Sequence, residues 1–177
     1  MAKTPQQARR VIDDFEADAS LRGVGARWTG FTDRVMGGRS DARLEQTTLE
    51  GKACLRLTGR VTRANGGGFV QMAARPEGKR KFFDATGYRG IELLVRGNGE
   101  HYNCHLRTAD TDWYDESYRA TFIAPRRWQK ICLEWSDFRP NGLEAPLDIA
   151  HISRIGLLGW MREFDADLAL GELTLFG

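Results

Sequence analysis

The sequence predicts an all-β fold, a β-sandwich of antiparallel sheets formed by one domain. Short runs rich in β-branched and aromatic residues recur along the chain, and its 20 glycines fall mainly between these runs. Helical periodicity is weak, so the chain lacks the strand–helix alternation that is typical of α/β enzymes. A length of 177 residues fits one domain, because domains usually span about 100–200 residues. We therefore expect a single β-sandwich domain over residues 1–177.

Nine segments combine alternating apolar and polar residues with β-branched or aromatic enrichment, and each is predicted to be a strand. In one of them, Leu55 and Leu57 share one face while Arg56 lies on the other, as expected for a sheet with one buried side. The nine predicted strands, in chain order, are Arg10–Phe15, Ala53–Val61, Gly68–Ala74, Gly90–Arg96, Tyr102–Thr108, Tyr118–Ile123, Gln129–Trp135, Ile152–Leu158 and Leu168–Phe176.

A tight-turn signal, Gly97-Asn98-Gly99, separates two of these strands. Asn-Gly readily supplies the positive φ angles that a two-residue hairpin turn requires. We therefore predict a β-hairpin that joins Ile91–Arg96 to Tyr102–Thr108. The helical signals are weak, and the one nearest the N-terminus covers Ala2–Val11.

Charge and hydropathy exclude several classes of protein. The chain has 26 Lys and Arg against 24 Asp and Glu, a formal net charge of +2, whereas nucleic-acid-binding proteins usually concentrate positive charge on one face. The best candidate apolar run, Ile155–Trp160, falls far short of the roughly 18 residues that a membrane span needs. Residues Met1–Arg10 lack the apolar stretch of a secretory signal. We therefore expect a cytoplasmic protein with no membrane span and no nucleic-acid partner.

The residue types that ligate metals or act as nucleophiles are few and badly spaced. Cys54, Cys104 and Cys132 form no Cys-x-x-Cys pair, and each lies in an apolar or alternating run, so we expect buried thiols. His101 and His105 would lie roughly 13 Å apart on a strand, too far to bind one metal. No P-loop, Gly-x-Ser-x-Gly or His-Glu-x-x-His motif is present. The sequence thus predicts no cofactor, no metal site and no enzymatic activity.

A structural ion near the chain ends stays open. β-Sandwiches that bind carbohydrate often hold such an ion where the first and last strands meet. Asp13, Asp14 and Glu16 in the N-terminal strand region, and Glu172 on the last strand, offer the oxygen ligands that calcium prefers. The sequence does not show whether these carboxylates converge.

Four carboxylates gather in one predicted loop, Asp110–Glu116, around Trp113 and Tyr114. A solvent-exposed acidic tip is the commonest reason for such a cluster. Two carboxylates beside an aromatic platform also serve glycosidases, and hard oxygens also bind calcium. Three interpretations therefore stay open: an exposed tip, a carbohydrate or protein recognition loop, and a metal or catalytic site. In the catalytic interpretation, the loop carboxylates would act with Arg107 or Arg119.

The glycine-rich segment Asn65-Gly66-Gly67-Gly68-Phe69 is a second loop of interest. It lacks the Lys-Ser or Lys-Thr of a P-loop, and it enters a strand rather than a helix. Three glycines permit a sharp turn, and they also let another surface approach the backbone closely. The segment is therefore either a structural turn or part of a rim that contacts a ligand.

The segment Asp33-Arg34-Val35-Met36-Gly37-Gly38-Arg39-Ser40 resembles the D-x-V-M-G-G-x-S signature of the complex I intermediate-associated protein 30 family. Other segments resemble that family in the same order, and the similarity spans about residues 11–176. These segments are Gly66–Phe69 (its GGGF), Phe83–Leu93 (its D-l-s-x-y-x-G-i-x-l run), Tyr118–Phe122 (its Y-x-a-x-F strand), Trp128-Gln129, Trp135–Phe138 and Ile155–Leu157.

The resemblance implies a jelly-roll, galactose-binding-domain-like sandwich, a fold shared with many carbohydrate-binding modules. Eukaryotic members act as chaperones in the assembly of mitochondrial respiratory complex I, and plant relatives assist photosystem biogenesis. This chain looks like a stand-alone, bacterial-type member. The resemblance therefore implies a non-catalytic binding domain that assists assembly of a membrane-associated redox complex, with its subunits or assembly intermediates as partners. The first alternative is a carbohydrate-binding module, and the second is an enzyme that uses the Asp110–Glu116 loop.

The signature has two physical interpretations. Val35 and Met36 either anchor in the sandwich core or face a partner, with Met supplying an adaptable contact. Five aromatic residues are expected near the ends of the sandwich, where they would form a binding patch if they converge: Trp28, Phe31, Trp113, Tyr114 and Trp160. The predicted binding residues are Asp33, Val35, Met36, Gly37, Gly38, Gly67, Gly68, Phe69, Trp113, Tyr114, Asp115 and Tyr118.

Overall fold

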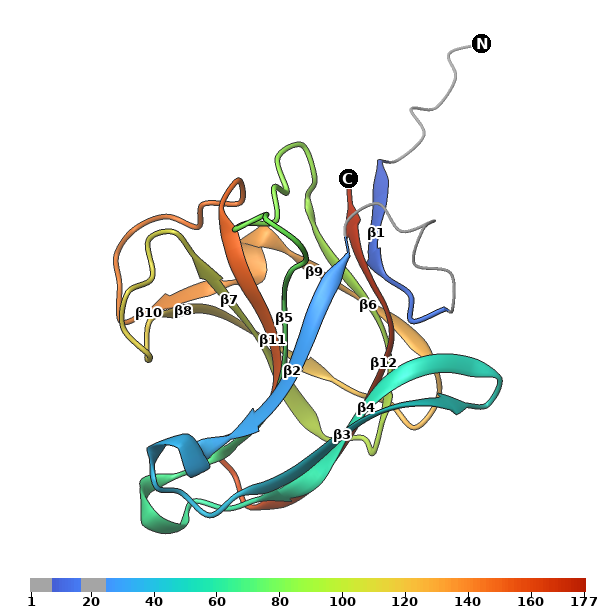
Figure 1. The fold of residues 1–177 in the computed structure, drawn as a ribbon, viewed down its shortest axis with the longest axis vertical. Helices are drawn as coiled ribbons and strands as arrows, with labels where there is room; N and C mark the ends of the chain where they lie inside the picture. Colours follow the sequence, from blue (N-terminus) through green and yellow to red (C-terminus); the bar gives the residue numbers. More distant parts are fainter. Residues whose placement is uncertain (1–7, 17–24) are drawn as a thin grey trace.

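The computed structural model describes residues 8–16 and 25–177, which form two six-stranded antiparallel sheets packed face to face (Figure 1). Sheet A contains β1 (Arg9–Asp13), β3 (Asp41–Leu49), β4 (Lys52–Val61), β6 (Gly90–Gly97), β9 (Gln129–Glu134) and β12 (Phe164–Phe176). Sheet B contains β2 (Ala26–Thr32), β5 (Phe69–Pro76), β7 (His101–Thr108), β8 (Ser117–Ile123), β10 (Arg139–Asn141) and β11 (Ile152–Trp160). The predicted all-β sandwich is confirmed.

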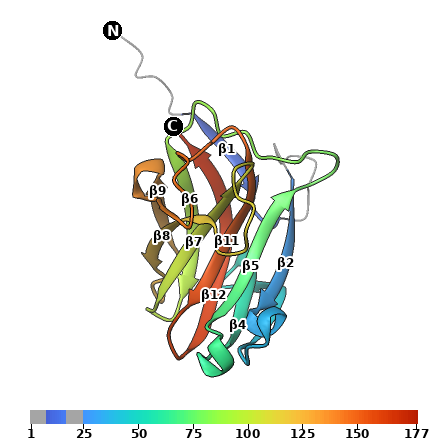
Figure 2. The same cartoon turned by 90° about the vertical axis from the view of Figure 1, so that its left-hand side faces the viewer.

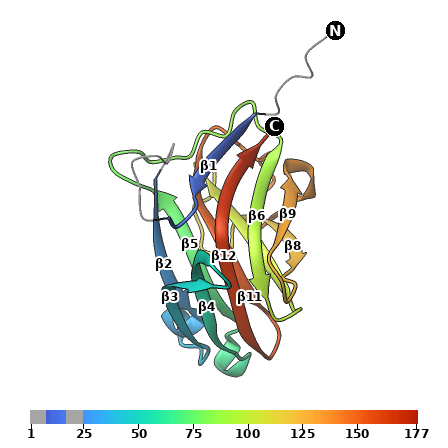
Figure 3. The ribbon, with the colours of Figure 1, turned by 90° about the vertical axis from the view of Figure 1, so that its right-hand side faces the viewer.

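The strand order shows that neighbours in space are mostly distant in sequence. Sheet A follows the order β3-β4-β12-β6-β9, and β1 also pairs with β12 (Figure 3). The 13-residue strand β12 pairs with β4 along its first half and with β1 along its second half, while β6 runs along its other side. Sheet B follows the order β10-β8-β7-β11-β5-β2 (Figure 2).

The core lies between the two sheets and is built from every second side chain. Leu57 and Ile91 of sheet A and Met72, Leu106 and Leu157 of sheet B have no solvent exposure. Burying each side chain of this size contributes roughly 1.5–3 kcal/mol to stability. The opposite face of each sheet is left for polar residues or for binding.

All nine predicted strands coincide with strands of the structure, and Leu55 and Leu57 are buried as the alternation predicted. Prediction missed three strands: β2, β3 and β10. The edge strand β3 is largely polar and only partly buried, so it gives no apolar alternation, and β10 has only three residues. The helical signal over Ala2–Val11 is wrong for residues 9–11, which lie in β1; residues 2–7 lie outside the described part of the chain.

The predicted hairpin at Gly97–Gly99 is wrong. β6 pairs with β9 and β12 in sheet A, whereas β7 pairs with β8 and β11 in sheet B, so the segment crosses between the sheets. Asn98 holds this crossing in place: its Oδ1 accepts a hydrogen bond from the Tyr102 hydroxyl at 2.7 Å, and its Nδ2 donates to the backbone oxygen of Asp165 at 2.8 Å. The turn signal was real, but it marks a change of sheet.

Removal of the Tyr102 hydroxyl is expected to destabilise this crossing. The hydroxyl also accepts a hydrogen bond from the backbone N–H of Asp167 at 2.9 Å, and the residue is completely buried. We expect Tyr102→Phe to lower the free energy of unfolding by about 1–3 kcal/mol, because its partly buried partners lose a hydrogen bond. Urea denaturation measures this loss. Tyr114→Phe is the matched control because Tyr114 is 77% exposed, and equal losses in the two variants would contradict the prediction.

Two of the three cysteines behave as predicted. Cys54 and Cys104 are buried, and burial raises the pKa of the Cys104 thiol. Cys132 is exposed, which corrects the prediction. It lies on the outer face of sheet A, where its thiol is 3.7 Å from the Glu92 carboxylate.

The first and last strands do meet, since β1 pairs with β12, but their carboxylates have other partners. Asp13 accepts hydrogen bonds from the Phe15 backbone and from the Trp28 indole, both at 2.9 Å. Glu172 accepts from Arg9 and from Thr174. Within residues 8–16 and 25–177, no group of three or more His, Cys, Asp or Glu is placed to hold a metal ion.

Three short 3-10 helices occur in the described chain: η2 (Asp33–Met36), η3 (Ala64–Gly66) and η4 (Trp135–Asp137). None of the described helices has the length and apolar character to cross a membrane. Two of them, η2 and η3, lie with the β11–β12 turn at one end of the sandwich. The C-terminal end of β12 lies at the other end (Figures 2 and 3). The end with η2 and η3 carries the candidate site.

Candidate functional site

The signature segment begins with a buried carboxylate. Asp33 has no solvent exposure, and its carboxylate accepts hydrogen bonds from the backbone N–H groups of Ser40 (2.9 Å), Gly68 (2.6 Å) and Phe69 (3.2 Å). The Ser40 hydroxyl donates a fourth bond at 2.5 Å. Burial disfavours the charged form, but these hydrogen bonds outweigh it and hold the pKa of Asp33 below its ordinary value. One carboxylate thus ties the η2 loop to the glycine-rich loop.

The glycines of both loops are needed to let the backbone reach that carboxylate. A Cβ on Gly38 or on Gly67 would collide with the side chain of Asp33. Gly37 caps η2 with a φ of 86°, a left-handed conformation that L residues rarely adopt. The Asp, the Gly-Gly pair and the Ser of the signature therefore form one structural unit.

Val35 and Met36 face solvent. Val35 is 71% exposed and Met36 is 51% exposed, so the core-anchor interpretation is wrong, whereas the partner-facing interpretation stays a prediction. The hydrogen bonds of Asp33 hold the η2 loop in place, and the Val35 and Met36 side chains project from that loop into solvent. Exposed apolar side chains on a fixed loop are typical of a contact surface.

Beside this loop, the outer face of sheet B is hollowed into a cavity of about 750 Å³. Its rim comes from the η2 loop, the η3 loop, the β7–β8 loop and the β11–β12 turn, and its floor comes from strands β2, β5, β7, β8 and β11. The lining residues are Phe31, Val35, Met36, Gly66, Gly67, Gly68, Phe69, Gln71, His105, Arg107, Tyr114, Asp115, Arg119, Arg154, Leu158, Trp160 and Met161.

Two small residues, Ala73 and Gly156, lie on neighbouring strands of this face. Ala73 of β5 and Gly156 of β11 lie opposite each other, and His105 of β7 lies on the other side of Gly156. A Cβ on Gly156 would overlap the side-chain amide of Gln71. Because Gly156 has no side chain, the Gln71 amide has room at the cavity floor.

Three floor residues have unsatisfied polar atoms. Among buried side-chain atoms of the described residues, Nε2 of Gln71, Nε2 of His105 and Nε of Arg154 have no hydrogen-bond partner. Gln71 is 2% exposed and His105 is 6% exposed. Unpaired buried polar groups are rare because each costs about 1–3 kcal/mol. All three lie at one cavity, which makes it the candidate functional site.

The floor is also cationic and aromatic. The guanidinium of Arg119 lies 5.0 Å from the ring centre of Trp160, and that of Arg154 lies 5.5 Å from the ring centre of Phe31. Burial, together with the charges of Arg107 and Arg75, lowers the pKa of Arg154 to about 10. Burial, with the charges of Arg119 and Arg154, lowers the pKa of His105 to about 3. His105 is therefore neutral at pH 7.

The structure brings most of the predicted binding residues to this end of the sandwich. Seven of them line the cavity: Val35, Met36, Gly67, Gly68, Phe69, Tyr114 and Asp115. Asp33, Gly37 and Gly38 shape the η2 loop. Trp113 is 69% exposed and lies outside the lining, and Tyr118 is 1% exposed, with its hydroxyl donating to the Ala145 backbone oxygen at 2.6 Å. Tyr118 is therefore a core residue and does not reach the cavity.

The acidic loop is more than an exposed tip, because Tyr114 and Asp115 form part of the rim. Glu116 holds the loop together by accepting hydrogen bonds from the backbone N–H groups of Asp112 (2.7 Å) and Trp113 (3.3 Å). The loop thus presents one aromatic ring and one carboxylate to the cavity.

Sequence analysis missed Gln71, His105 and Arg154 as site residues. A usable signal existed on β7, where His105 and Arg107 are two residues apart and therefore share a face. A His and an Arg on the face opposite the core of a central strand indicate a polar outer surface. Which strands flank that face cannot be deduced without the topology.

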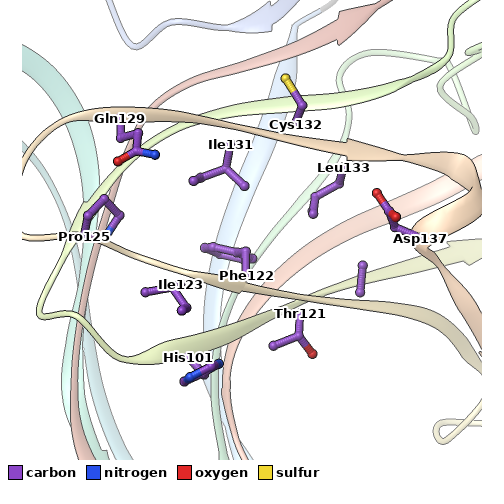
Figure 4. Close-up of a pocket in the computed structure, with 11 residues that line it drawn as sticks. His101, Thr121, Phe122, Ile123, Pro125, Gln129, Ile131, Cys132, Leu133 and Asp137 are labelled. Atoms are coloured by element: carbon purple, nitrogen blue, oxygen red, sulfur yellow. The ribbon is translucent and has the colours of Figure 1, made fainter.

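A second cavity, of about 700 Å³, opens at the side of the sandwich between β8 and β9. Figure 4 shows Ile131 and Leu133 pointing toward Phe122, whereas the Cys132 thiol points away. Polar side chains of His101, Thr121, Gln129 and Asp137 share the lining with the apolar ones. It lacks the clustered charges and unpaired buried atoms of the first cavity.

The matching family model covers the fold and the site together. The model described as complex I intermediate-associated protein 30 (CIA30) matches residues 14–170, which include both loops that Asp33 joins. The chain belongs to the CIA30 family. The family resemblance of the signature segment is thereby confirmed. No curated protein sequence matches this CIA30 chain significantly.

Solved structures similar to this CIA30 chain include carbohydrate-binding modules. The family 11 module from Clostridium thermocellum, in complex with a β-1,3-1,4-mixed-linked tetrasaccharide, has a TM-score of 0.73 and 12% identity, covering 96% of this chain and 95% of that one. A family 29 module has a TM-score of 0.55 and 10% identity, covering 97% and 89%. At such identities the likeness establishes the jelly-roll, galactose-binding-like fold alone.

Proposed function

We propose that this CIA30 chain is a non-catalytic binding domain that assists assembly of a multi-subunit, membrane-associated redox complex of the respiratory complex I type. Family membership supports a role associated with complex I assembly in general. The observation that carries the proposal is the exposed apolar rim around the cavity. We expect the protein to act in the cytoplasm, as its sequence predicts, on subunits or assembly intermediates of such a complex.

The apolar rim consists of Val35, Met36, Tyr114 and Met161, which are between 44% and 77% exposed. All four line the mouth of the same cavity although they come from three separate loops. Such side chains are costly to leave in water, and burying each against a partner gains up to roughly 1.5–3 kcal/mol. Methionine also adapts its shape to different apolar partners, which suits a protein that handles assembly intermediates.

The rim is held rigid before any partner arrives. Asp33 ties the η2 loop to the glycine-rich loop, and the backbone N–H of Met161 donates to the Gly68 oxygen at 2.6 Å. Met161 adopts a φ of 53°, an unusual value that this contact maintains. A pre-ordered surface loses little conformational entropy on binding, so little of the free energy gained from its apolar contacts is offset.

Polar replacement of the signature side chains is expected to abolish capture of the partner complex. We expect the double variant Val35→Ser/Met36→Ser to retain less than about one tenth of the captured complex subunits, because two rim anchors worth over about 1.4 kcal/mol together are lost. Affinity purification from gently solubilised cells, quantified by mass spectrometry, measures the effect. Both residues are exposed, so the melting temperature should stay within about 2 °C of the parent value.

Ile123→Ser is the matched control, because Ile123 is 49% exposed and lies on β8 away from the rim. The control should capture as much of the complex as the parent protein. Equal capture by the double variant would refute the role of the rim. Failure of the parent protein to enrich any respiratory subunit or assembly intermediate would refute the assembly function itself.

A carbohydrate-binding module is the second candidate, and the aromatic floor of the cavity favours it. The rings of Phe31 and Phe69 have centres 5.9 Å apart, and those of Phe69 and Trp160 are 6.1 Å apart. Aromatic faces often stack on sugar rings. Saturable binding of a neutral oligosaccharide that Trp160→Ala abolishes would favour this candidate, and Trp113→Ala tests the exposed ring of the acidic loop.

A further inference from the structure

The arginines that line the cavity form no ion pair at contact distance, and the carboxylates of Asp112, Asp115 and Glu116 act on Arg107 only from farther away. Three arginines line the cavity, Arg107, Arg119 and Arg154, against one carboxylate, Asp115. Among the described residues, no carboxylate oxygen lies within 4.0 Å of these three guanidinium groups. Elsewhere in the same part of the chain, arginines such as Arg56 are paired at 2.8 Å.

We propose that this cavity binds a small organic anion, a molecule that carries a carboxylate or phosphate group on a body with an apolar face. The inference goes beyond the proposed assembly function and does not depend on it. It assigns the arginine-lined floor, whereas the assembly function rests on the apolar rim.

The hydrogen-bonding groups of the floor favour an acceptor-rich ligand. Nε2 of Gln71 and Nε of Arg154 are donors without an acceptor among the described residues. The neutral ring of His105 adds a nitrogen that either accepts or donates, depending on its tautomer. An oxyanion accepts several hydrogen bonds at once, and a planar guanidinium binds carboxylate or phosphate through two parallel bonds. A neutral ligand would leave the positive charge unbalanced.

The aromatic groups define the other part of the ligand. Trp160 contacts Phe69 on one side and His105 on the other, with ring centres 6.1 and 5.0 Å apart. Phe31 continues this apolar surface toward β2. A flat apolar face, such as an aromatic ring or one side of a sugar ring, can pack on this surface while the anionic group reaches the arginines.

The depth of the unsatisfied groups favours a small molecule over a protein segment. Gln71 and His105 are at least nine-tenths buried, below the rim loops, and the cavity of about 750 Å³ falls in the usual range for small-molecule sites. The Gln71 amide lies over Gly156, where a Cβ would overlap it. An acidic segment of a partner protein is therefore the less favoured occupant, and the test below separates the two.

Paired probes that differ in one charged group provide the test. We would titrate the protein with benzoate, phenyl phosphate and glucuronate, and with the neutral counterparts benzyl alcohol and glucose, at constant ionic strength. Binding would be followed by NMR through the Trp160 indole signal and the arginine Nε–H signals. We expect at least one anion to bind at least about tenfold more tightly than its neutral counterpart and to shift both sets of signals. The carboxylates and phenyl phosphate distinguish the two sources of an oxyanion.

Arg154→Met tests the assigned cation, and Arg60→Met is the matched control on sheet A, where the Arg60 side chain is 52% exposed. We expect Arg154→Met to weaken anion binding at least about tenfold while the control binds as the parent does. Removal of a half-buried cation that lacks a carboxylate partner should leave the melting temperature unchanged or higher. Arg119→Met provides a second variant, with the same expected loss, if Arg154→Met does not fold.

Three results would overturn the proposal. The first is no binding of any anion at millimolar concentration, and the second is equal affinity for the anionic and neutral probes. The third is binding of a short oligoglutamate peptide without binding of any small anion, which would assign the floor to an acidic segment of a partner. None of these results bears on capture of complex subunits through the apolar rim, so the two proposals fail separately.

Discussion

Replacement of Asp33 by alanine is expected to lower the free energy of unfolding by about 3 kcal/mol. The substitution removes one buried carboxylate and leaves the N–H groups of Ser40, Gly68 and Phe69 without their acceptor. For a chain of this length the melting temperature should fall by about 6–12 °C. The same change should release the η2 loop from the glycine-rich loop, so capture of the partner complex should fall as well. Asp41→Ala, at an exposed position on β3, is the matched control and should change stability by less than about 0.5 kcal/mol.

The sign of the pH dependence follows from the lowered pKa of Asp33. The unfolded chain binds a proton near the ordinary aspartate pKa of about 3.9, whereas the folded protein resists protonation until a lower pH. The contribution of Asp33 is therefore complete above about pH 5 and is lost as the pH falls through the folded-state pKa. Asp33→Asn should show a flatter stability profile below about pH 4 than the parent protein. A parallel profile would mean that Asp33 does not carry the charge that this network requires.

The second large effect is expected at His105, in a different pH range. Burial, with the charges of Arg119 and Arg154, lowers the pKa of His105 to about 3, while the unfolded chain titrates near about 6.5. The unfolded state therefore binds the proton first, and stability is lost as the pH falls below about 6.5. Between pH 7.5 and pH 5 we expect a loss of about 2 kcal/mol from this residue, at about 1.4 kcal/mol per pH unit.

Urea denaturation of the parent protein and of His105→Gln at pH 7.5, 6.0 and 5.0 measures this contribution. The variant should lose about 2 kcal/mol less than the parent over that range, because glutamine does not titrate. His151→Gln is the matched control, since His151 is exposed and pairs with Asp148 at 2.8 Å. A parent profile that is flat between pH 7.5 and pH 5 would show that His105 is accessible to protons in the folded state.

The sandwich could be predicted from the sequence because apolar and polar residues alternate along single strands. Strands such as β4 carry apolar residues on one face, and that pattern survives in the fold. The turn signal at Gly97–Gly99 shows the limit of such reasoning. Positive φ at Gly99 is compatible with a hairpin and also with a crossing between sheets, and only the pairing of β6 and β7 with sequence-distant strands decides between them. Pairing between sequence-distant strands leaves no local signature.

The candidate site was predictable at its rim and hidden at its floor. The rim residues Val35 and Met36 belong to a contiguous segment with a recognisable family pattern. The floor joins Gln71, His105 and Arg154, one residue from each of three strands, and each has an ordinary sequence environment. Their common property, an unpaired polar atom in a shared hollow, exists only after β5, β11 and β7 have become neighbours.

The central position of β12 has a consequence for how the chain is made. This strand pairs with β1, β4 and β6, so the β3–β4 pair and the β6–β9 pair join into one sheet only after residues 164–176 have left the ribosome. The earlier strands must wait during synthesis with unpaired edges and uncovered apolar faces, and closing the sheet then requires contacts across nearly the whole chain. Folding of this kind is slow and exposed to aggregation. We therefore expect this protein, which is proposed to help others assemble, to fold late itself. Until β12 pairs with β4 and β6, the chain should be prone to aggregation.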